Sequence, residues 1–250
     1  MREPKWGVIE GDCIEIMRIM NRDVKLIFAD APYNQGVDYG EGPKADRMSY
    51  DQFYQWSIGW LRLCVANLAA DGSLFVMTSD DWAAEYVLTL KTLGLHMRNW
   101  IKWYEAFGAN CTKKFNRCSR HILYFVKDPK RFTFNADAGA VRTKSARQAA
   151  GDKRANPEGK LFDDVWQVPR VCGTHYERVE WAPTQVPLEI MRRIIGCASN
   201  PGDLVFDPVS GSATTGVSAI EMGREYLGIE LNAEYARLSR ERLSKVVEGA

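Results

Sequence analysis

A largely apolar run near the start of the chain, 24–29, ends abruptly in Asp30, Ala31, Pro32 and Tyr33. A short apolar run bounded by a turn signal is typical of a strand buried inside a parallel sheet. In open α/β sheets, ligands bind outside the carboxyl ends of such strands. This segment therefore predicts a buried strand that delivers a carboxylate and an aromatic ring to the ligand-binding edge of a sheet.

Strand-like and helix-like patterns alternate along the rest of the chain. Apolar runs predict strands at 6–9, 24–29, 73–78, 98–103, 121–127, 203–207 and 225–230. Apolar residues at helical spacing predict helices over 50–69, 81–93, 187–199, 213–223 and 232–247. Asp71-Gly72 is expected to end the first of these helices. The alternation favours a single α/β domain over residues 1–250, with a doubly wound, mostly parallel sheet.

The composition suits a protein with a sizeable core, because 46% of its 250 residues are hydrophobic. The sequence holds no apolar stretch of about 18 residues or more, so no membrane span is expected. Residues 1–6 lack the apolar core of a signal peptide, which favours a cytoplasmic location.

Six cysteines are scattered along the chain, at 13, 64, 111, 118, 172 and 197. None forms a Cys-x-x-Cys pair, so neither a zinc ribbon nor a disulfide framework is indicated. Cys111, Cys118 and His121 lie near one another in the sequence, but their spacing fits no standard zinc pattern and a fourth ligand is not evident. We therefore expect buried thiols and no metal site.

Positive charge is concentrated in one part of an almost neutral chain. Residues 111–160 carry thirteen Lys or Arg and four acids, a net charge of +9, whereas the whole chain has a net charge of +1. Aromatic residues lie among these charges, at 115, 124, 132 and 134. Residues 136–182 also break the alternation of strands and helices. We interpret residues 111–160 as a polyanion-binding face, with a solvated loop as the alternative, and 136–182 as a basic insertion that contacts nucleic acid.

The second half of the chain contains a pattern for an adenosine-type cofactor. A strand ends at Asp207, a loop of small residues follows, and a helix and a second strand lead to Glu230. Small residues let a backbone approach a ligand, and an acid at the tip of the second strand is placed to accept both hydroxyls of a ribose. The loop lacks the glycine fingerprint of dinucleotide sites and the Gly-Lys-Ser/Thr end of a phosphate-binding loop, which argues against NAD and ATP.

Four segments resemble motifs of the DNA amino-methyltransferases. Residues 30–33 are similar to Asp-Pro-Pro-Tyr, 182–187 to Thr-Gln-Lys-Pro, and 207–215 to Asp-Pro-Phe-x-Gly-Ser-Gly-Thr-Thr. Residues 10–13 resemble the segment whose acid faces the cofactor adenine. The base-binding motif precedes the cofactor motif. That order resembles the β class, a Rossmann-like fold with circularly permuted motifs, and several motifs in one order are more specific than any of them alone.

This resemblance implies an enzyme that moves the methyl group of S-adenosylmethionine to an exocyclic amine of a base flipped out of double-stranded DNA. The implied catalytic residues are Asp30, Ala31, Pro32 and Tyr33. The Asp30 carboxylate and the Ala31 carbonyl would accept the amine N–H groups, and the Tyr33 ring would stack on the base. The implied cofactor-binding residues are Asp12, Cys13, Asp30, Thr184, Gln185, Asp207, Pro208, Ser210, Gly211, Ser212, Ala213, Thr214 and Glu230.

The chain departs from the family pattern at four positions. Ala31 replaces a proline, Val186 a lysine, Val209 a phenylalanine and Ala213 a glycine. An alanine is tolerable at position 213 only if the backbone there avoids positive φ. These departures leave open a catalytically weak relative that acts by binding DNA.

Further alternatives concern substrate and setting. Aspartate at position 30 is commoner in the adenine enzymes of the family, so N6 of adenine is preferred over N4 of cytosine as the acceptor. A methyltransferase acting on RNA or on a small molecule is a further alternative, and it would not need the basic insertion. The resemblance also implies a prokaryotic or phage-encoded protein. Restriction-modification and a homodimer are found among relatives.

Overall fold

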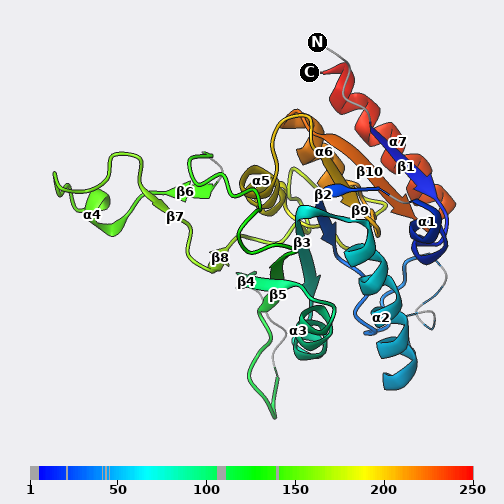
Figure 1. Cartoon of the computed structure of the whole chain (residues 1–250). Helices are drawn as coiled ribbons and strands as arrows, with labels where there is room; N and C mark the ends of the chain where they lie inside the picture. Colours follow the sequence, from blue (N-terminus) through cyan, green and yellow to red (C-terminus); the bar gives the residue numbers. More distant parts are fainter. Residues whose placement is uncertain are drawn as a thin grey trace.

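A mostly parallel sheet forms the centre of the molecule (Figure 1). The computed structural model describes residues 6–20, 22–40, 42, 44, 46–105, 111–138 and 141–249. Eight of the described strands lie in the order β1-β10-β9-β2-β3-β5-β4-β8. They span β1 Trp6–Glu10, β2 Val24–Ala29, β3 Leu68–Thr78, β4 His96–Tyr104, β5 Ser119–Val126, β8 Val165–Gln167, β9 Leu204–Asp207 and β10 Glu225–Glu230. All neighbouring pairs are parallel except those of β5, which is antiparallel to β3 and β4.

Helices cover both faces of this sheet, with α5 and α6 above it and α2 and α3 below it in Figure 1. Alternate side chains of β2 explain why: Leu26 and Phe28 join the core between the sheet and α5, whereas Ile27 and Ala29 join the core between the sheet and α2. A strand buried on both faces needs a helical layer on each. The main helices span α1 Cys13–Met20, α2 Tyr50–Asn67, α3 Ala83–Thr92, α5 Leu188–Ala198, α6 Thr214–Glu221 and α7 Ala233–Glu248. The predicted doubly wound α/β fold is confirmed.

The order of the strands reverses between β9 and β2. These strands are parallel neighbours, yet the chain leaves β9 through α6 toward β10 on one side and leaves β2 through α2 toward β3 on the other. Ligands of doubly wound sheets bind in the crevice at such a switch point. Asp207 ends β9 and Asp30 follows β2, so the two strongest sequence motifs meet at this crevice.

Every strand and helix that the periodicity predicts is present, with altered ends, and α1 is one of several elements that it does not predict. Asp12 caps this helix, because its Oδ1 accepts hydrogen bonds from the backbone N–H groups of Ile14 at 2.7 Å and Glu15 at 3.1 Å. An acid in this position satisfies N–H groups that have no partner inside the helix. Asp12 therefore has a structural task besides the cofactor contact predicted for it.

Asp71 and Gly72 do not end a helix, contrary to the prediction. Helix α2 ends at Asn67 and β3 begins at Leu68, so both residues lie inside a strand. The pairing of β2 with β3 shifts register here, and Lys25 of β2 forms an ion pair with Asp71 at 2.5 Å. A glycine inside a strand commonly marks such an irregularity, which sequence alone does not distinguish from a turn.

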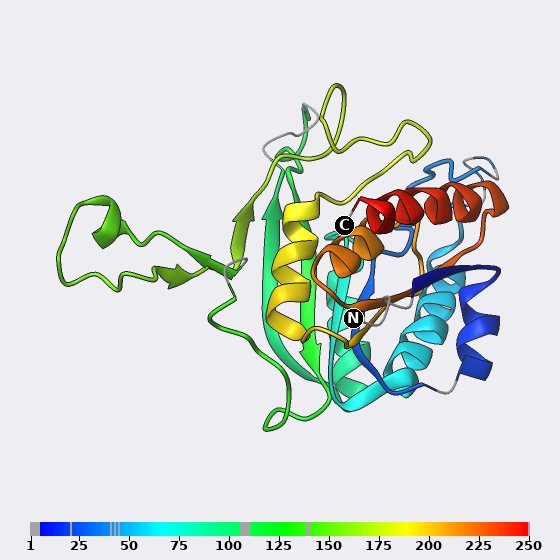
Figure 2. The same cartoon turned by 90° about the horizontal axis from the view of Figure 1, so that it is seen from above.

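The predicted insertion 136–182 is divided between an arm and the sheet, and residues 139–140 lie outside the described residues. Strands β6 (Arg142–Thr143) and β7 (Lys160–Leu161) and the short helix α4 (Ala146–Ala149) form an arm that extends away from the body in both views (Figures 1 and 2). Strand β8 instead pairs with β4 and forms one edge of the main sheet. The predicted insertion therefore includes one strand, β8, that belongs to the main sheet and not to the arm.

The close packing around Gly72 gives a test of the β3 irregularity. Gly72→Ala is expected to lower the free energy of unfolding by about 1–3 kcal/mol. The reason is that a Cβ would lie 2.8 Å from Leu68 Cδ1 and 2.9 Å from the Val24 carbonyl oxygen. In Gly59→Ala of α2, the new Cβ meets Ile14 Cδ1 at an ordinary 3.7 Å. This control should gain about 0.5–1 kcal/mol. Urea unfolding measures both, and effects of the same sign would contradict this packing.

Candidate active site

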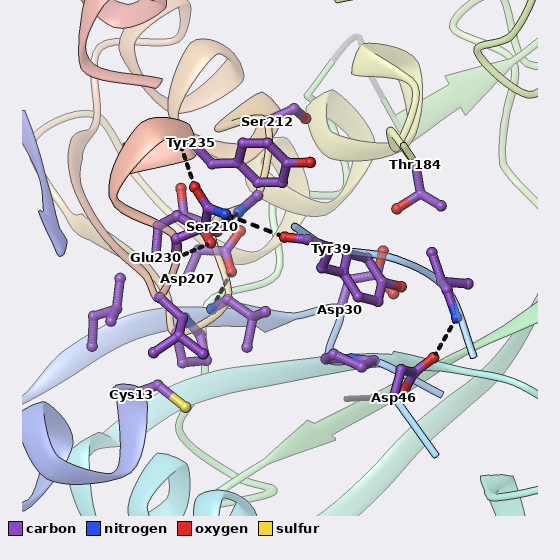
Figure 3. A pocket seen from close by; sticks show the side chains of 18 of the residues that line it. Cys13, Asp30, Tyr39, Asp46, Thr184, Asp207, Ser210, Ser212, Glu230 and Tyr235 are labelled. Carbon is purple, nitrogen blue, oxygen red and sulfur yellow. Dashed lines mark hydrogen bonds between the residues drawn. The ribbon is translucent and has the colours of Figure 1, made fainter. Parts of the chain in front are cut away.

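A cavity of about 390 Å³ opens at the switch point. Its walls come from the segments that follow the carboxyl ends of β1, β2, β9 and β10, and from Thr184 in the connector before α5. Figure 3 shows Asp207 and Glu230 close together, with Asp30 and Thr184 further along the cavity. The two halves of the predicted site, which are far apart in the sequence, therefore share one enclosed space.

Most of the predicted site residues line this cavity. The lining includes Asp12, Cys13, Asp30, Pro32, Tyr33, Thr184, Asp207, Pro208, Ser210, Gly211, Ser212, Thr214 and Glu230. Ala31 does not line the cavity; it is buried in the core between the sheet and α2. Gln185 holds the connector: its Oε1 accepts from the Val179 N–H at 3.0 Å and its Nε2 donates to the Glu177 carbonyl at 2.8 Å.

Ala213 also lies behind the cavity wall, and its backbone differs from expectation. Its φ is +57°, in the left-handed region that alanine disfavours, so the condition stated for an alanine at this position is not met. It is fully buried and precedes the first residue of α6. A left-handed conformation costs an alanine about 1–2 kcal/mol. The loop therefore keeps the shape that a glycine would adopt freely, although the residue has changed.

Asp30, Tyr33 and Arg120 form a polar cluster at one end of the cavity. The Tyr33 hydroxyl donates a hydrogen bond to the Asp30 carboxylate. The Arg120 guanidinium lies 5.4 Å from the centre of the Tyr33 ring, and its Nε donates to Glu105 at 2.7 Å. Burial raises the pKa of Asp30, while the Arg120 cation and the hydrogen bond from Tyr33 oppose that rise. The pKa of Asp30 therefore stays raised, although two contacts of the cluster favour its charged form.

Arg120 is a site residue that the sequence interpretation missed. In the sequence analysis it was included only among the thirteen Lys and Arg residues of 111–160, just before a predicted strand. Strand β5 runs antiparallel to β3, so its first residues lie at the edge where β3 ends. An antiparallel strand that begins with a cation brings that cation to the ligand-binding edge, but nothing in one sequence indicates the direction of β5.

Glu230 provides the acid at the other end of the cavity. Its Oε2 accepts from the Gly211 N–H at 2.8 Å and its Oε1 accepts from the Asn232 N–H at 2.9 Å. Burial raises the pKa of Glu230, and these backbone hydrogen bonds lower it. Each carboxylate oxygen has a second lone pair, so both remain able to accept a hydroxyl group of a ligand.

Asp207 is a third carboxylate in the same space. Its Oδ2 accepts from the Thr215 hydroxyl at 2.7 Å and its Oδ1 from the Val209 N–H at 3.0 Å. Burial raises its pKa to about 7; the two hydrogen bonds oppose the rise, and Asp30 and Glu230 add repulsion. Three acids in one cavity favour a ligand that carries positive charge.

Asp46 is a second missed residue, and it shapes the wall after Tyr33. Its carboxylate accepts from four consecutive backbone N–H groups at 2.9–3.1 Å, those of Asn34, Gln35, Gly36 and Val37. Such a ring of donors around one carboxylate fixes a loop without regular secondary structure. No local pattern predicts it, because Asp46 reaches back across nine or more residues.

Known proteins resemble this chain in sequence. The profile of the N6/N4 family described as DNA methylase matches residues 24–241. The DNA adenine methyltransferase YhdJ of Escherichia coli strain K12 is 37% identical over 244 residues, covering 94% of this chain and 82% of that protein. The type II methyltransferase M.HpaI of Haemophilus parainfluenzae is 31% identical over 235 residues, covering 94% of this chain and 72% of that protein.

Solved structures share the fold. The crystal structure of the M1.HpyAVI–SAM complex has a TM-score of 0.70 at 21% identity, covering 95% of this chain and 98% of that chain. The PvuII DNA methyltransferase, described as cytosine-N4-specific, has a TM-score of 0.70 at 14% identity, covering 98% of this chain and 94% of that chain. These matches extend over nearly all of the chain.

The raised pKa of Asp207 predicts a pH-dependent stability. Between its ordinary pKa of 3.8 and about 7, folded protein holds a proton that unfolded protein releases. The contribution of Asp207 to stability therefore falls as pH rises through this range, by on the order of 1 kcal/mol per pH unit, and is level above it. Asp207→Asn lacks this loss. In urea unfolding, the free energy of unfolding of the variant should therefore rise relative to that of wild type between pH 5 and pH 8. An unchanged difference between the two proteins would show that Asp207 does not titrate in this range.

Proposed function

Because the chain belongs to the N6/N4 DNA methylase family, we propose that it transfers the methyl group of S-adenosylmethionine to N6 of adenine in double-stranded DNA. The observation that carries this proposal is the single cavity lined by both Asp30 and Glu230. The aspartate at position 30 and the relative named as an adenine enzyme favour adenine. N4 of cytosine is the second candidate, favoured by the structural likeness to a cytosine-N4 enzyme.

The charges of the cavity suit this cofactor. S-adenosylmethionine supplies an electrophilic methyl group on a positively charged sulfur. Asp30, Asp207 and Glu230 offer three carboxylates to such a cation, in a space of about 390 Å³ that lies within the range of small-molecule sites. Glu230 accepts the ribose hydroxyls on its remaining lone pairs, and Thr184 contacts the methionine end from the connector.

Asp30 orients the acceptor amine. In the protein alone, its carboxylate accepts a hydrogen bond from Tyr33. An incoming base replaces that hydrogen bond with one from its own amine N–H, and the Ala31 carbonyl accepts the second. The released Tyr33 ring stacks on the base. Holding the two reactants in line contributes on the order of 7–11 kcal/mol at most. The amine loses its proton after the methyl group has arrived.

Arg120 favours the charged form of Asp30 in this step. Its guanidinium opposes the burial that raises the pKa of Asp30, and a carboxylate favours the positive charge that develops on the amine nitrogen. The target base reaches the cavity only after leaving the duplex, which costs a few kcal/mol. Stacking on Tyr33, worth about 1–3 kcal/mol, offsets part of this cost.

The arm contributes to DNA binding in this proposal. Exposed cations on or beside α4 include Lys144, Arg147 and Lys153. Other cations of residues 111–160 form hydrogen bonds within the protein: Arg142 donates to the carbonyl groups of Ala136 at 2.9 Å and Glu158 at 3.0 Å. The electrostatic contact with phosphates therefore falls to the exposed group, and these three residues give a direct test of it.

The biological setting follows the relatives. M.HpaI is named as a type II methyltransferase, which favours a restriction-modification setting in a bacterium or phage for this chain as well. Within the described residues, no helix is both long and apolar enough to cross a membrane. A cytoplasmic location and a homodimer stay predictions.

Substitution of Asp30 tests the chemistry. Asp30→Ala is expected to abolish methyl transfer from labelled S-adenosylmethionine to mixed-sequence DNA while calorimetry still detects cofactor binding. Asp23→Ala is the matched control, because Asp23 is an exposed aspartate at the opposite end of β2. Mass spectrometry of the digested wild-type product should find N6-methyladenine. N4-methylcytosine would select the second candidate, and full turnover by Asp30→Ala would remove Asp30 from the mechanism.

Substitution of the arm cations tests the DNA contact. Replacing Lys144, Arg147 and Lys153 together by alanine should weaken duplex binding and reduce the slope of log affinity against log salt by about 3. A control variant removes the same charge from three exposed helix positions outside the arm, Arg18, Lys91 and Lys245. DNA binding and turnover unaffected by the arm variant would instead favour a methyltransferase for RNA or a small molecule.

A further inference from the structure

The loop between β4 and β5 carries a large apolar side chain fully in solvent. Phe115 is 98% exposed, the highest exposure among the large hydrophobic residues of the described chain. Lys113 and Lys114, just before it, are exposed as well. A single exposed apolar residue is ordinary, but an aromatic ring beside two cations combines the two groups that bind stacked bases and phosphates.

The base of this loop is fastened to the end of β3. Arg117 lies 2.7 Å from the Asp81 carboxylate and 3.1 Å from that of Asp80. The loop is also closed on itself, because the Cys111 N–H donates to the Asn116 Oδ1 at 2.8 Å. Phe115 therefore projects from a loop with a fixed base, and Figure 1 shows this connection extending beyond the strands at the bottom of the view.

The same edge of the sheet holds the cavity. Gln35, which follows the base-binding motif, donates to Asp81 at 3.4 Å. Trp82 Nε1 donates to the Tyr33 carbonyl at 3.1 Å. Both contacts join the end of β3, where the loop is fastened, to the segment that carries Tyr33. In the proposed function a duplex delivers a base into the cavity across this edge, and the loop that carries Phe115 is fastened beside it.

We propose that Phe115 enters the DNA duplex and fills the space left by the extruded base, while Lys113 and Lys114 bind the flanking phosphates. This inference rests on the proposed function and adds to it the residue that stabilises the opened duplex. The empty position in the stack is flat and apolar, and a phenyl ring fills it without needing a hydrogen bond. Apolar side chains inserted between base steps are a general means of holding distorted DNA.

The charges around the ring favour DNA over a second copy of this chain as the occupant. An exposed ring intended for a protein interface usually lies in an apolar patch with few lysines. Here the neighbouring positions are lysines, and the acids of this region, Asp80 and Asp81, are already paired with Arg117. The surface presented by Phe115 thus has the charge that complements a phosphate backbone.

The test compares one target sequence in two duplexes, after sequencing of methylated DNA has located the target. One duplex is fully paired; in the other, the base opposite the target is missing, so the target needs little energy to leave the stack. Phe115→Ala should lower kcat/KM on the paired duplex by roughly tenfold to a hundredfold and recover most of that loss on the second duplex. Phe115→Trp should retain activity on both, because its ring still fills the space.

Control measurements separate this role from others. Ile19→Ala removes an apolar side chain that is 83% exposed on α1, and it should change neither value. A fluorescent 2-aminopurine at the target position should brighten less with Phe115→Ala than with wild type, without any need for turnover. If Phe115→Ala lowers activity equally on both duplexes or on neither, the proposal is wrong. It is also wrong if the variant changes the sedimentation of the protein, since Phe115 would then lie between copies. Failure of the proposed function looks different, because wild type would methylate neither duplex.

Discussion

Three carboxylates converge at the ends of neighbouring strands, and the proposed chemistry depends on them. Asp30, Asp207 and Glu230 follow or end β2, β9 and β10, and all three line one cavity. Burial raises the pKa of each. Backbone N–H groups, the Thr215 hydroxyl and the Arg120 guanidinium reduce this penalty without removing it. A cationic ligand offsets the remaining cost of burying these negative charges, which is why the cavity suits a sulfonium cofactor.

The sheet topology is what brings these acids together. β2 and β9 are neighbours in the sheet although about 180 residues separate them, and the strand order reverses between them. Side chains at successive parallel strand ends then point into one crevice. Close packing behind the crevice leaves no space for a side chain at position 228. A Cβ on Gly228 would lie 2.5 Å from the Tyr226 hydroxyl oxygen and 2.7 Å from Ser210 Oγ. The cofactor half of the site is therefore shaped by backbone as much as by side chains.

Sequence patterns predict those parts of the site that depend on local order. Asp30 and Glu230 could be placed because each terminates an apolar run, and the ends of such runs meet at one edge. Arg120 and Asp46 could not, because one depends on the antiparallel direction of β5 and the other on a loop that turns back on itself. Ala213 adopts a positive φ that its identity argues against, because the surrounding loop determines the backbone.

The most direct measurement of the shared-cavity account is a diffraction experiment on crystals soaked with S-adenosylhomocysteine, the demethylated product. The account predicts ribose hydroxyls within hydrogen-bonding distance of the Glu230 carboxylate, with the sulfur atom directed along the cavity toward Asp30. Electron density for the adenosine beside Asp30 and Tyr33, or outside the cavity, would contradict it.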